Sequence, residues 1–74
     1  MPPTATLPLN TQEAERRRAL RGYTQAELAQ RVHASHAHVN QVLTGNRRPS
    51  AFLVHRLAAA LGCDVEDLLL KDAS

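Results

Sequence analysis

The clearest hydrophobic periodicity in the chain lies between Pro49 and Gly62, two residues that usually lie at helix ends. At about 100° per residue, five apolar positions of this segment fall within an arc of about 120°, the width expected of a helix face that packs on a core. Phe52 and Leu53 fall outside that arc, so we expect them to be covered either by another part of the fold or by a second subunit. The five positions are Ala51, Val54, Leu57, Ala58 and Leu61.

Capping residues divide the rest of the chain into further helical segments. Thr24 and Glu27 have the spacing of a capping box, which predicts a helix over residues 25–32. Each of the three glycines follows a predicted helix, where helices commonly end. No segment alternates like a strand, so we predict an all-α fold with five short helices. The other expected caps and helices are Asn10 for 11–21, Ser35 for 36–44, Ser50 for 51–61 and Asp64 for 65–70.

The ends of the chain differ in composition from its middle. Residues 1–9 carry three prolines and no charged side chain, which predicts a flexible leader that lacks the Arg or Lys of a minor-groove arm. Residues 10–70 form the expected domain, and residues 71–74 form a short tail. A chain of 74 residues is near the lower limit for folding around a single core.

The composition excludes several classes of protein. A single cysteine, Cys63, excludes an internal disulfide, and together with four histidines it does not match the spacing of a structural zinc site. We therefore expect no metal and no other cofactor. No apolar run approaches the roughly 20 residues of a membrane span, and the first residues lack the features of a signal peptide. These observations predict a soluble, cytoplasmic protein.

Charge is distributed unevenly along the chain. The formal net charge is +2, but residues 10–56 hold eight arginines and three glutamates, whereas residues 57–74 hold one lysine and four acidic residues. A basic body of this kind suggests a polyanionic partner. An uneven charge distribution is also typical of an ordinary solvated surface. The choice between a polyanion-binding surface and a solvated one therefore depends on the pattern of residues 33–48.

Residues 33–35 separate two predicted helices by a three-residue turn, the length found in DNA-binding helix-turn-helix motifs. His33 stands where this turn often has glycine, and histidine is among the residues that tolerate a positive φ. In the second helix, Val39, Val42 and Leu43 share a face that we expect to be buried, while His38 lies at the flank. The outer face has no acidic side chain and consists of His36, Ala37, Asn40, Gln41 and Thr44.

This outer face is suited to the major groove of duplex DNA. It carries no anion that would repel phosphates, and its side chains can contact base edges: Gln can make two hydrogen bonds to adenine, His can donate to guanine, and Ala offers an apolar contact. We therefore predict that His36, Ala37 and Gln41 read bases. The predicted contacts to the DNA backbone come from Gln25, Thr44, Asn46, Arg47 and Arg48.

Several short stretches of the chain share one family pattern. They are TQAELAQRV at 24–32, Ala34–Ser35, Val39, Gly45, Arg48–Ser50, Leu57–Ala58, Leu61–Gly62 and Asp67–Leu69. In this combination the chain resembles the phage repressor and Cro (XRE-like) family, over about residues 10–70. The resemblance implies a five-helix, lambda-repressor-like DNA-binding bundle. By position it also implies phosphate binding by Gln25, base reading by His36, Ala37 and Gln41, and backbone contacts at Asn40, Arg47 and Arg48.

The chain departs from this family at Leu43. Many relatives carry an acidic residue there, paired with an arginine at the position of Arg18. We therefore expect Arg18 to be available to DNA or to another subunit.

A sequence-specific transcriptional regulator, and more specifically a repressor, is the leading functional hypothesis. One such module reads only about four or five base pairs, so we expect a homodimer on a palindromic operator, assembled in solution or only on the DNA. The expected subunit contacts are Phe52, Leu53, Leu69 and Leu70.

Two other functions stay open. A DNA-binding antitoxin would bind a toxin through Phe52, Leu53 or the tail, and a protein-interaction adaptor would keep the fold without binding DNA. We do not expect an enzyme, because no nucleophile and base, and no paired carboxylates, can be placed in one cleft.

Overall fold

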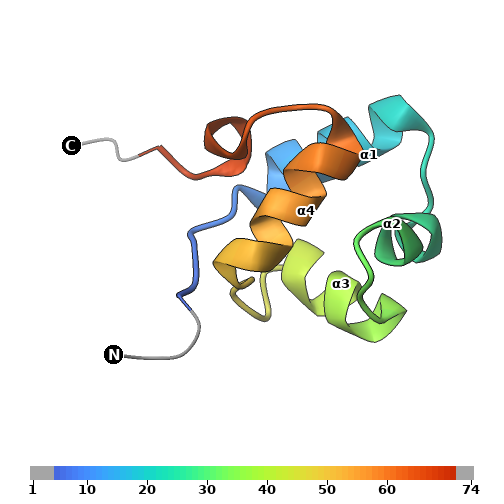
Figure 1. Cartoon of the computed structure of the whole chain (residues 1–74), viewed down its shortest axis with the longest axis horizontal. Helices are drawn as coiled ribbons and strands as arrows, with labels where there is room; N and C mark the ends of the chain where they lie inside the picture. Colours follow the sequence, from blue (N-terminus) through green and yellow to red (C-terminus); the bar gives the residue numbers. More distant parts are fainter. Residues whose placement is uncertain (1–4, 72–74) are drawn as a thin grey trace.

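A computed structural model describes residues 5–71 of the chain. These residues form four α-helices, α1 (Thr11–Arg21), α2 (Gln25–Arg31), α3 (His36–Leu43) and α4 (Ala51–Leu61), followed by a 3₁₀ turn, η1 (Val65–Leu68). In Figure 1, α4 crosses the middle of the molecule, α3 lies along its lower edge and α2 stands to the right. Within residues 5–71, no helix has the length and apolar character needed to cross a lipid bilayer.

Polar side chains hold the first turn of each α-helix, as predicted. The Oδ1 atom of Asn10 accepts a hydrogen bond from the backbone N of Glu13 at 3.1 Å. The hydroxyl of Thr24 accepts from the backbone N of Glu27 at 3.0 Å, and the Glu27 carboxylate accepts from the backbone N of Thr24 at 3.1 Å, which completes the capping box. The serines before α3 and α4 act in the same way. These helix starts are confirmed, and α2 and α3 each end one residue earlier than predicted.

The predicted fifth helix is a shorter element. Residues 65–68 form a 3₁₀ turn, and Leu69 leaves it in an extended conformation (φ −93°, ψ 147°). The extended backbone pairs with the N-terminal segment: Asn10 N donates to Leu68 O at 2.7 Å, and Leu70 N donates to Pro8 O at 2.8 Å. These bonds compete with a further helical turn. The five-helix count is therefore corrected, for the described part of the chain, to four α-helices and one 3₁₀ turn.

Residues 5–9 differ from the expected flexible leader, whose first four residues lie outside the described part of the chain. Leu9 is buried, with 7% of its surface exposed. Leu7 N donates to Pro49 O at 3.2 Å, and Ala51 N donates to Ala5 O at 2.8 Å. Pro8 lacks an N–H donor, but its carbonyl group and that of Ala5 still accept hydrogen bonds from the domain.

The core is assembled around α4, which contacts α1, α2 and η1. Because neighbours surround this helix, it buries a wider face than the predicted arc. Leu53 therefore belongs to the core, with 5% of its surface exposed, so of the two covers expected for it the fold supplies the cover and a second subunit does not. Phe52, one residue earlier, is 71% exposed. The largest fully buried side chains are Leu28, Leu57, Leu68, Val32, Val39, Val42 and Val54.

Ion pairs along α1 neutralise part of its arginine run. The Glu13 carboxylate lies 2.8 Å from Nη2 of Arg16 and 2.7 Å from Nε of Arg17. Hydrogen bonds from Arg16, and then from Arg17, lower the pKa of Glu13 from 4.5 to about 2. A folded-state pKa below the unfolded value means that this contribution to stability is present above about pH 4.5 and is lost as the pH falls toward 2.

We therefore expect the Glu13→Gln substitution to lower the unfolding midpoint at neutral pH, because it removes the charge that both arginines bind. The difference from the wild type should shrink between about pH 4.5 and 2. Thermal or urea unfolding followed by circular dichroism across pH 2–7 measures it. Glu66→Gln, at an exposed carboxylate of η1, is the matched control. A gap that stays constant over this range would contradict the assignment.

The turn between α2 and α3 contains a residue in the left-handed region. His33 has φ 58° and is the one residue other than glycine with a positive φ within residues 5–71. Histidine therefore adopts here the positive φ that glycine often adopts in such turns, as expected. The left-handed region costs an L residue about 1–2 kcal/mol.

We expect His33→Gly to raise the free energy of unfolding by about 0.5–1 kcal/mol, because relief of the left-handed strain exceeds the entropy cost of a new glycine. His33→Ala keeps the Cβ atom and should give no such gain. Urea unfolding of the three proteins measures the effect, and equal stability of the Gly and Ala variants would argue against backbone strain at this position.

Candidate nucleic-acid interface

The connection from α2 to α3 presents α3 at the molecular surface. The chain leaves α2 at Val32, Ala34 N donates to Ala29 O at 3.0 Å, and the hydroxyl of Ser35 accepts from His38 N at 3.1 Å. Val32 and Val39, one on each side of the turn, are buried with 0% and 1% exposure. Two short helices are thus fixed against each other, and the outer helix forms an edge of the molecule (Figure 1).

The two predicted faces of α3 differ in burial as expected. Val39, Val42 and Leu43 point into the core, with 1%, 1% and 4% of their surface exposed. The side chain of His38 is half-buried at the flank. The face that the sequence assigned to DNA is exposed and comprises His36, Ala37, Asn40 and Gln41, continued by Thr44 at the C-cap.

The loop after α3 folds back on the end of the helix. The hydroxyl of Thr44 donates to the carbonyl oxygens of Asn40 and Gln41 at 2.8 and 3.2 Å. Nδ2 of Asn46 donates to that hydroxyl at 3.2 Å. Both side chains therefore use donors within the loop, which they hold in place. Arg47 and Arg48, which follow, are exposed and take no part in the ion pairs found within residues 5–71.

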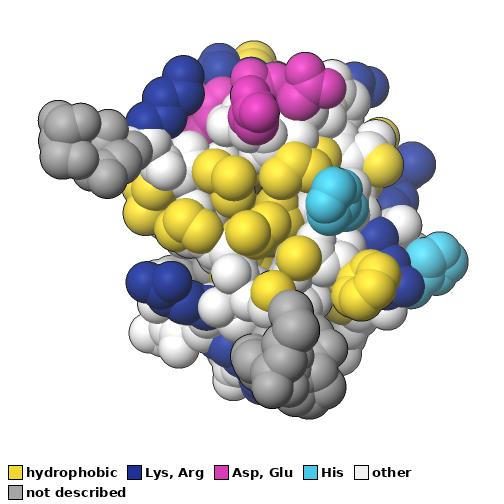
Figure 2. Space-filling model, turned by 60° about the vertical axis from the view of Figure 1, so that its left-hand side comes forward, with side chains coloured by type: hydrophobic (Ala, Val, Ile, Leu, Met, Phe, Trp, Pro, Cys, Tyr) yellow, Lys and Arg dark blue, Asp and Glu magenta, His cyan; other side chains and the backbone are white. Residues whose placement is uncertain are grey.

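Acidic side chains are absent from the middle of the chain. Between Leu28 and Cys63 the sequence contains four arginines and all four histidines, but no Asp or Glu. Within residues 5–71, the acidic residues lie on α1, at the start of α2 and around η1. Figure 2 shows acidic side chains gathered at the upper edge of one face and basic ones near its sides and below. The surface around α3 is therefore the part of the molecule best suited to approach a polyanion.

Gln25 and Arg18 lie together between α1 and α2, in contacts that the sequence did not predict. Nε2 of Gln25 donates to Oε1 of Glu15 at 3.2 Å. Arg18 donates to Oε2 of Glu15 and, through Nη1, to the carbonyl oxygen of Tyr23 at 2.6 Å. The expectation that Arg18 has no partner is therefore wrong, because Glu15, one helical turn earlier, takes the place of the missing acid.

Several apolar side chains are exposed at the start of α4 and after η1. Apolar side chains spread across the middle of the face drawn in Figure 2. Of the predicted subunit contacts, Phe52 is 71% and Leu70 57% exposed, and Leu69 is half-buried. Leu53 is buried and does not contribute to this surface.

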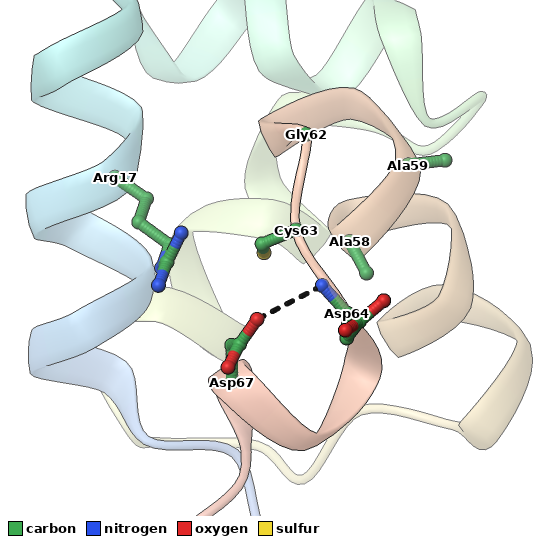
Figure 3. Close-up of a pocket in the computed structure, with 7 residues that line it drawn as sticks. All are labelled: Arg17, Ala58, Ala59, Gly62, Cys63, Asp64 and Asp67. Atoms are coloured by element: carbon green, nitrogen blue, oxygen red, sulfur yellow. Dashed lines mark hydrogen bonds between the residues drawn. The ribbon is translucent and has the colours of Figure 1, made fainter.

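A shallow pocket between α1, the end of α4 and η1 contains the single cysteine (Figure 3). Burial is the main cause that raises the pKa of the Cys63 thiol, which favours the protonated form over the reactive thiolate. The nearby Asp67 carboxylate accepts a hydrogen bond from the backbone N of Asp64 at 3.1 Å and so caps η1. The carboxylate of this pocket that faces the cysteine loop therefore stabilises η1.

Comparison with known proteins agrees with this geometry. The helix-turn-helix domain family matches residues 12–70 of the chain. The chain is also 40% identical over 52 residues to an uncharacterized HTH-type transcriptional regulator of Methanothermobacter thermautotrophicus, in an alignment that covers 69% of this chain and 75% of that protein. The family model covers most of the chain, and the structure contains a two-helix motif with an exposed outer helix. The chain therefore belongs to the helix-turn-helix domain family.

Proposed function

We propose that the chain is a sequence-specific DNA-binding transcriptional regulator of the phage repressor and Cro type, and that it acts as a repressor. The observation that carries this proposal is the exposed, acid-free face of α3, which is followed in the chain by the exposed Arg47 and Arg48. The relative from Methanothermobacter thermautotrophicus is described as a transcriptional regulator, which supports the same function. Repression follows when the bound protein covers a promoter, and a reporter gene under such a promoter tests the sign of regulation.

The proposed roles follow from exposure and side-chain chemistry. His36, Ala37 and Gln41 lie on the outer face of α3, where short or polar side chains can reach base edges in the major groove. Asn40, Arg47 and Arg48, together with Gln25, contact phosphates. Thr44 and Asn46 were predicted as backbone contacts, and their hydrogen bonds give them the further role of shaping the loop before the two arginines.

Base readout and phosphate binding should respond differently to substitution. Gln41→Ala should cost about 1–3 kcal/mol on the preferred site and relax the preference at one base position, because it removes a bidentate contact. Arg48→Ala should weaken binding to all duplexes alike and reduce the slope of log K against log salt by about one. Fluorescence anisotropy with a duplex selected from a random pool, and with random duplex, measures both effects.

Gln41 and Arg48 are both exposed, so both variants should fold, which thermal unfolding checks. Equal losses on selected and random duplex for Gln41→Ala would argue against base reading by this residue. An unchanged salt dependence for Arg48→Ala would remove it from the phosphate contacts.

We further propose that two copies bind a palindromic operator as a homodimer that assembles on the DNA. A stable protein interface buries about 800 Å² on each partner, a large share of the chain's 4930 Å² of accessible surface. Phe52 and Leu70, with Leu69, offer a smaller apolar contact. An interface of that size needs help from DNA, which holds two half-sites about one helical turn apart.

Phe52→Glu should therefore abolish cooperative binding of the second copy, because it places a charge in the apolar contact. Sedimentation with a palindromic duplex should give two protomers per duplex for the wild type and fewer for the variant at equal concentration. Leu20→Glu is the matched control, since Leu20 is 72% exposed on α1, close to the C-terminal end of α4 rather than to its start. One protomer per duplex at saturation for the wild type would contradict the dimer. Two protomers per duplex for the Phe52→Glu variant would contradict the role of Phe52 in the dimer. A second protein, such as a toxin, would then be the next binding partner to test at Phe52.

A further inference from the structure

A cluster of hydrogen bonds joins the start of α2 to α1. The Glu15 carboxylate accepts from Nε2 of Gln25 at 3.2 Å through Oε1, and from Nε of Arg18 at 3.1 Å through Oε2. Arg18 adds a second bond to the same carboxylate oxygen from Nη2 and uses Nη1 for the carbonyl oxygen of Tyr23. Glu15, Arg18 and Gln25 are all half-buried, so the cluster is held by its surroundings as well as by its hydrogen bonds.

Glu15 decides which end of the Gln25 carboxamide faces α1. An ionised carboxylate only accepts hydrogen bonds, so the amide NH₂ group must face it and the amide oxygen cannot. The NH₂ group has a second hydrogen, which points away from the first acceptor. That N–H can donate to a phosphate oxygen, whereas an amide oxygen in the same place would repel the phosphate.

We propose that Glu15 is a positioning residue for DNA-backbone binding: its carboxylate holds the amide of Gln25 with an N–H directed outward, and Arg18 offsets the carboxylate charge. The proposal rests on the proposed function, because it takes Gln25 as a phosphate contact. In this proposal an acidic residue, Glu15, favours the binding of a polyanion although both carry negative charge. The bonds from Arg18 make this tolerable, since a carboxylate with no cation beside it would oppose a nearby phosphate.

A double-mutant cycle on DNA affinity tests this role. With Gln25 in place, Glu15→Ala should weaken binding about 3–10-fold, the effect of losing one orienting hydrogen bond, even though it removes a negative charge. In a Gln25→Ala background, the same substitution should leave affinity unchanged or raise it. Random duplex should show the same pattern as the selected duplex, because phosphate contacts carry no sequence information. Fluorescence anisotropy at fixed salt measures all four proteins on both duplexes.

Two further variants separate positioning from folding and from charge. Glu15→Gln keeps the length of the side chain, but either end of its amide can face Gln25, so affinity should fall between those of the wild type and Glu15→Ala. Glu13→Ala removes the same charge from the same helix and breaks pairs with Arg16 and Arg17 instead. Its effect on affinity should be equal in the two Gln25 backgrounds. Thermal unfolding establishes that each variant is folded.

Equal effects of Glu15→Ala in both backgrounds, or tighter binding with Gln25 in place, would overturn the proposal and leave Glu15 as an acid that only repels DNA. This failure is distinct from failure of the proposed function. In the first case, the wild type still binds duplex and Arg48→Ala still weakens it. In the second, neither the wild type nor any variant binds duplex.

Discussion

The position of α3 depends on the turn that joins it to α2, and on one backbone conformation within that turn. His33 adopts a φ of 58°, which costs an L residue about 1–2 kcal/mol. The same conformation directs α3 back onto the core, where Val39, Val42 and Leu43 are at most 4% exposed. Burial of each such side chain is worth about 1.5–3 kcal/mol, so the gain exceeds the strain and fixes the turn. Because these three side chains turn one face of α3 toward the core, the opposite face of the helix lies at the molecular surface.

Leu43 packs α3 onto the core as an apolar side chain, so this position contributes no ion pair to the fold. Leu43 is 4% exposed, and an acidic side chain there would need a buried partner. Replacement of a buried ion pair by apolar packing is often neutral or stabilising by about 1–4 kcal/mol. Arg18 then pairs with Glu15 on its own helix and binds the Tyr23 carbonyl. Arg18 thus stabilises the connection from α1 to α2, next to Gln25.

Local signals made most of the fold predictable. Asn10, Thr24 and Ser35 cap helices through bonds to residues three positions away, so sequence spacing alone specifies them. The burial of Val39 and exposure of Gln41 follow equally from helical periodicity.

The differences from the sequence predictions come from contacts between distant parts of the chain. Residues 5–9 are held by hydrogen bonds to the backbone of residues 49–51 and 68–70. Backbone hydrogen bonds do not depend on side-chain type, so the composition of this segment could not predict them. Leu53 is buried because other elements surround α4. The periodicity of one helix considered alone does not contain those neighbours. The contact of Gln25 with Glu15 joins two helices across ten positions of sequence, so no local pattern indicated it.

Charge segregation completes the link between fold and proposed function. The run Arg16–Arg18 is the most basic stretch of the sequence, yet all three arginines pair with Glu13 or Glu15 on the same helix. Arg31 lies over the ring of Tyr23 at 4.4 Å, and Arg56 reaches the carbonyl oxygen of Val32. Arg47 and Arg48 are thus the basic side chains placed beside the exposed face of α3. A long-range field of this shape orients the approach to a polyanion but carries no sequence information, so the proposed function assigns discrimination between bases to the outer face of α3.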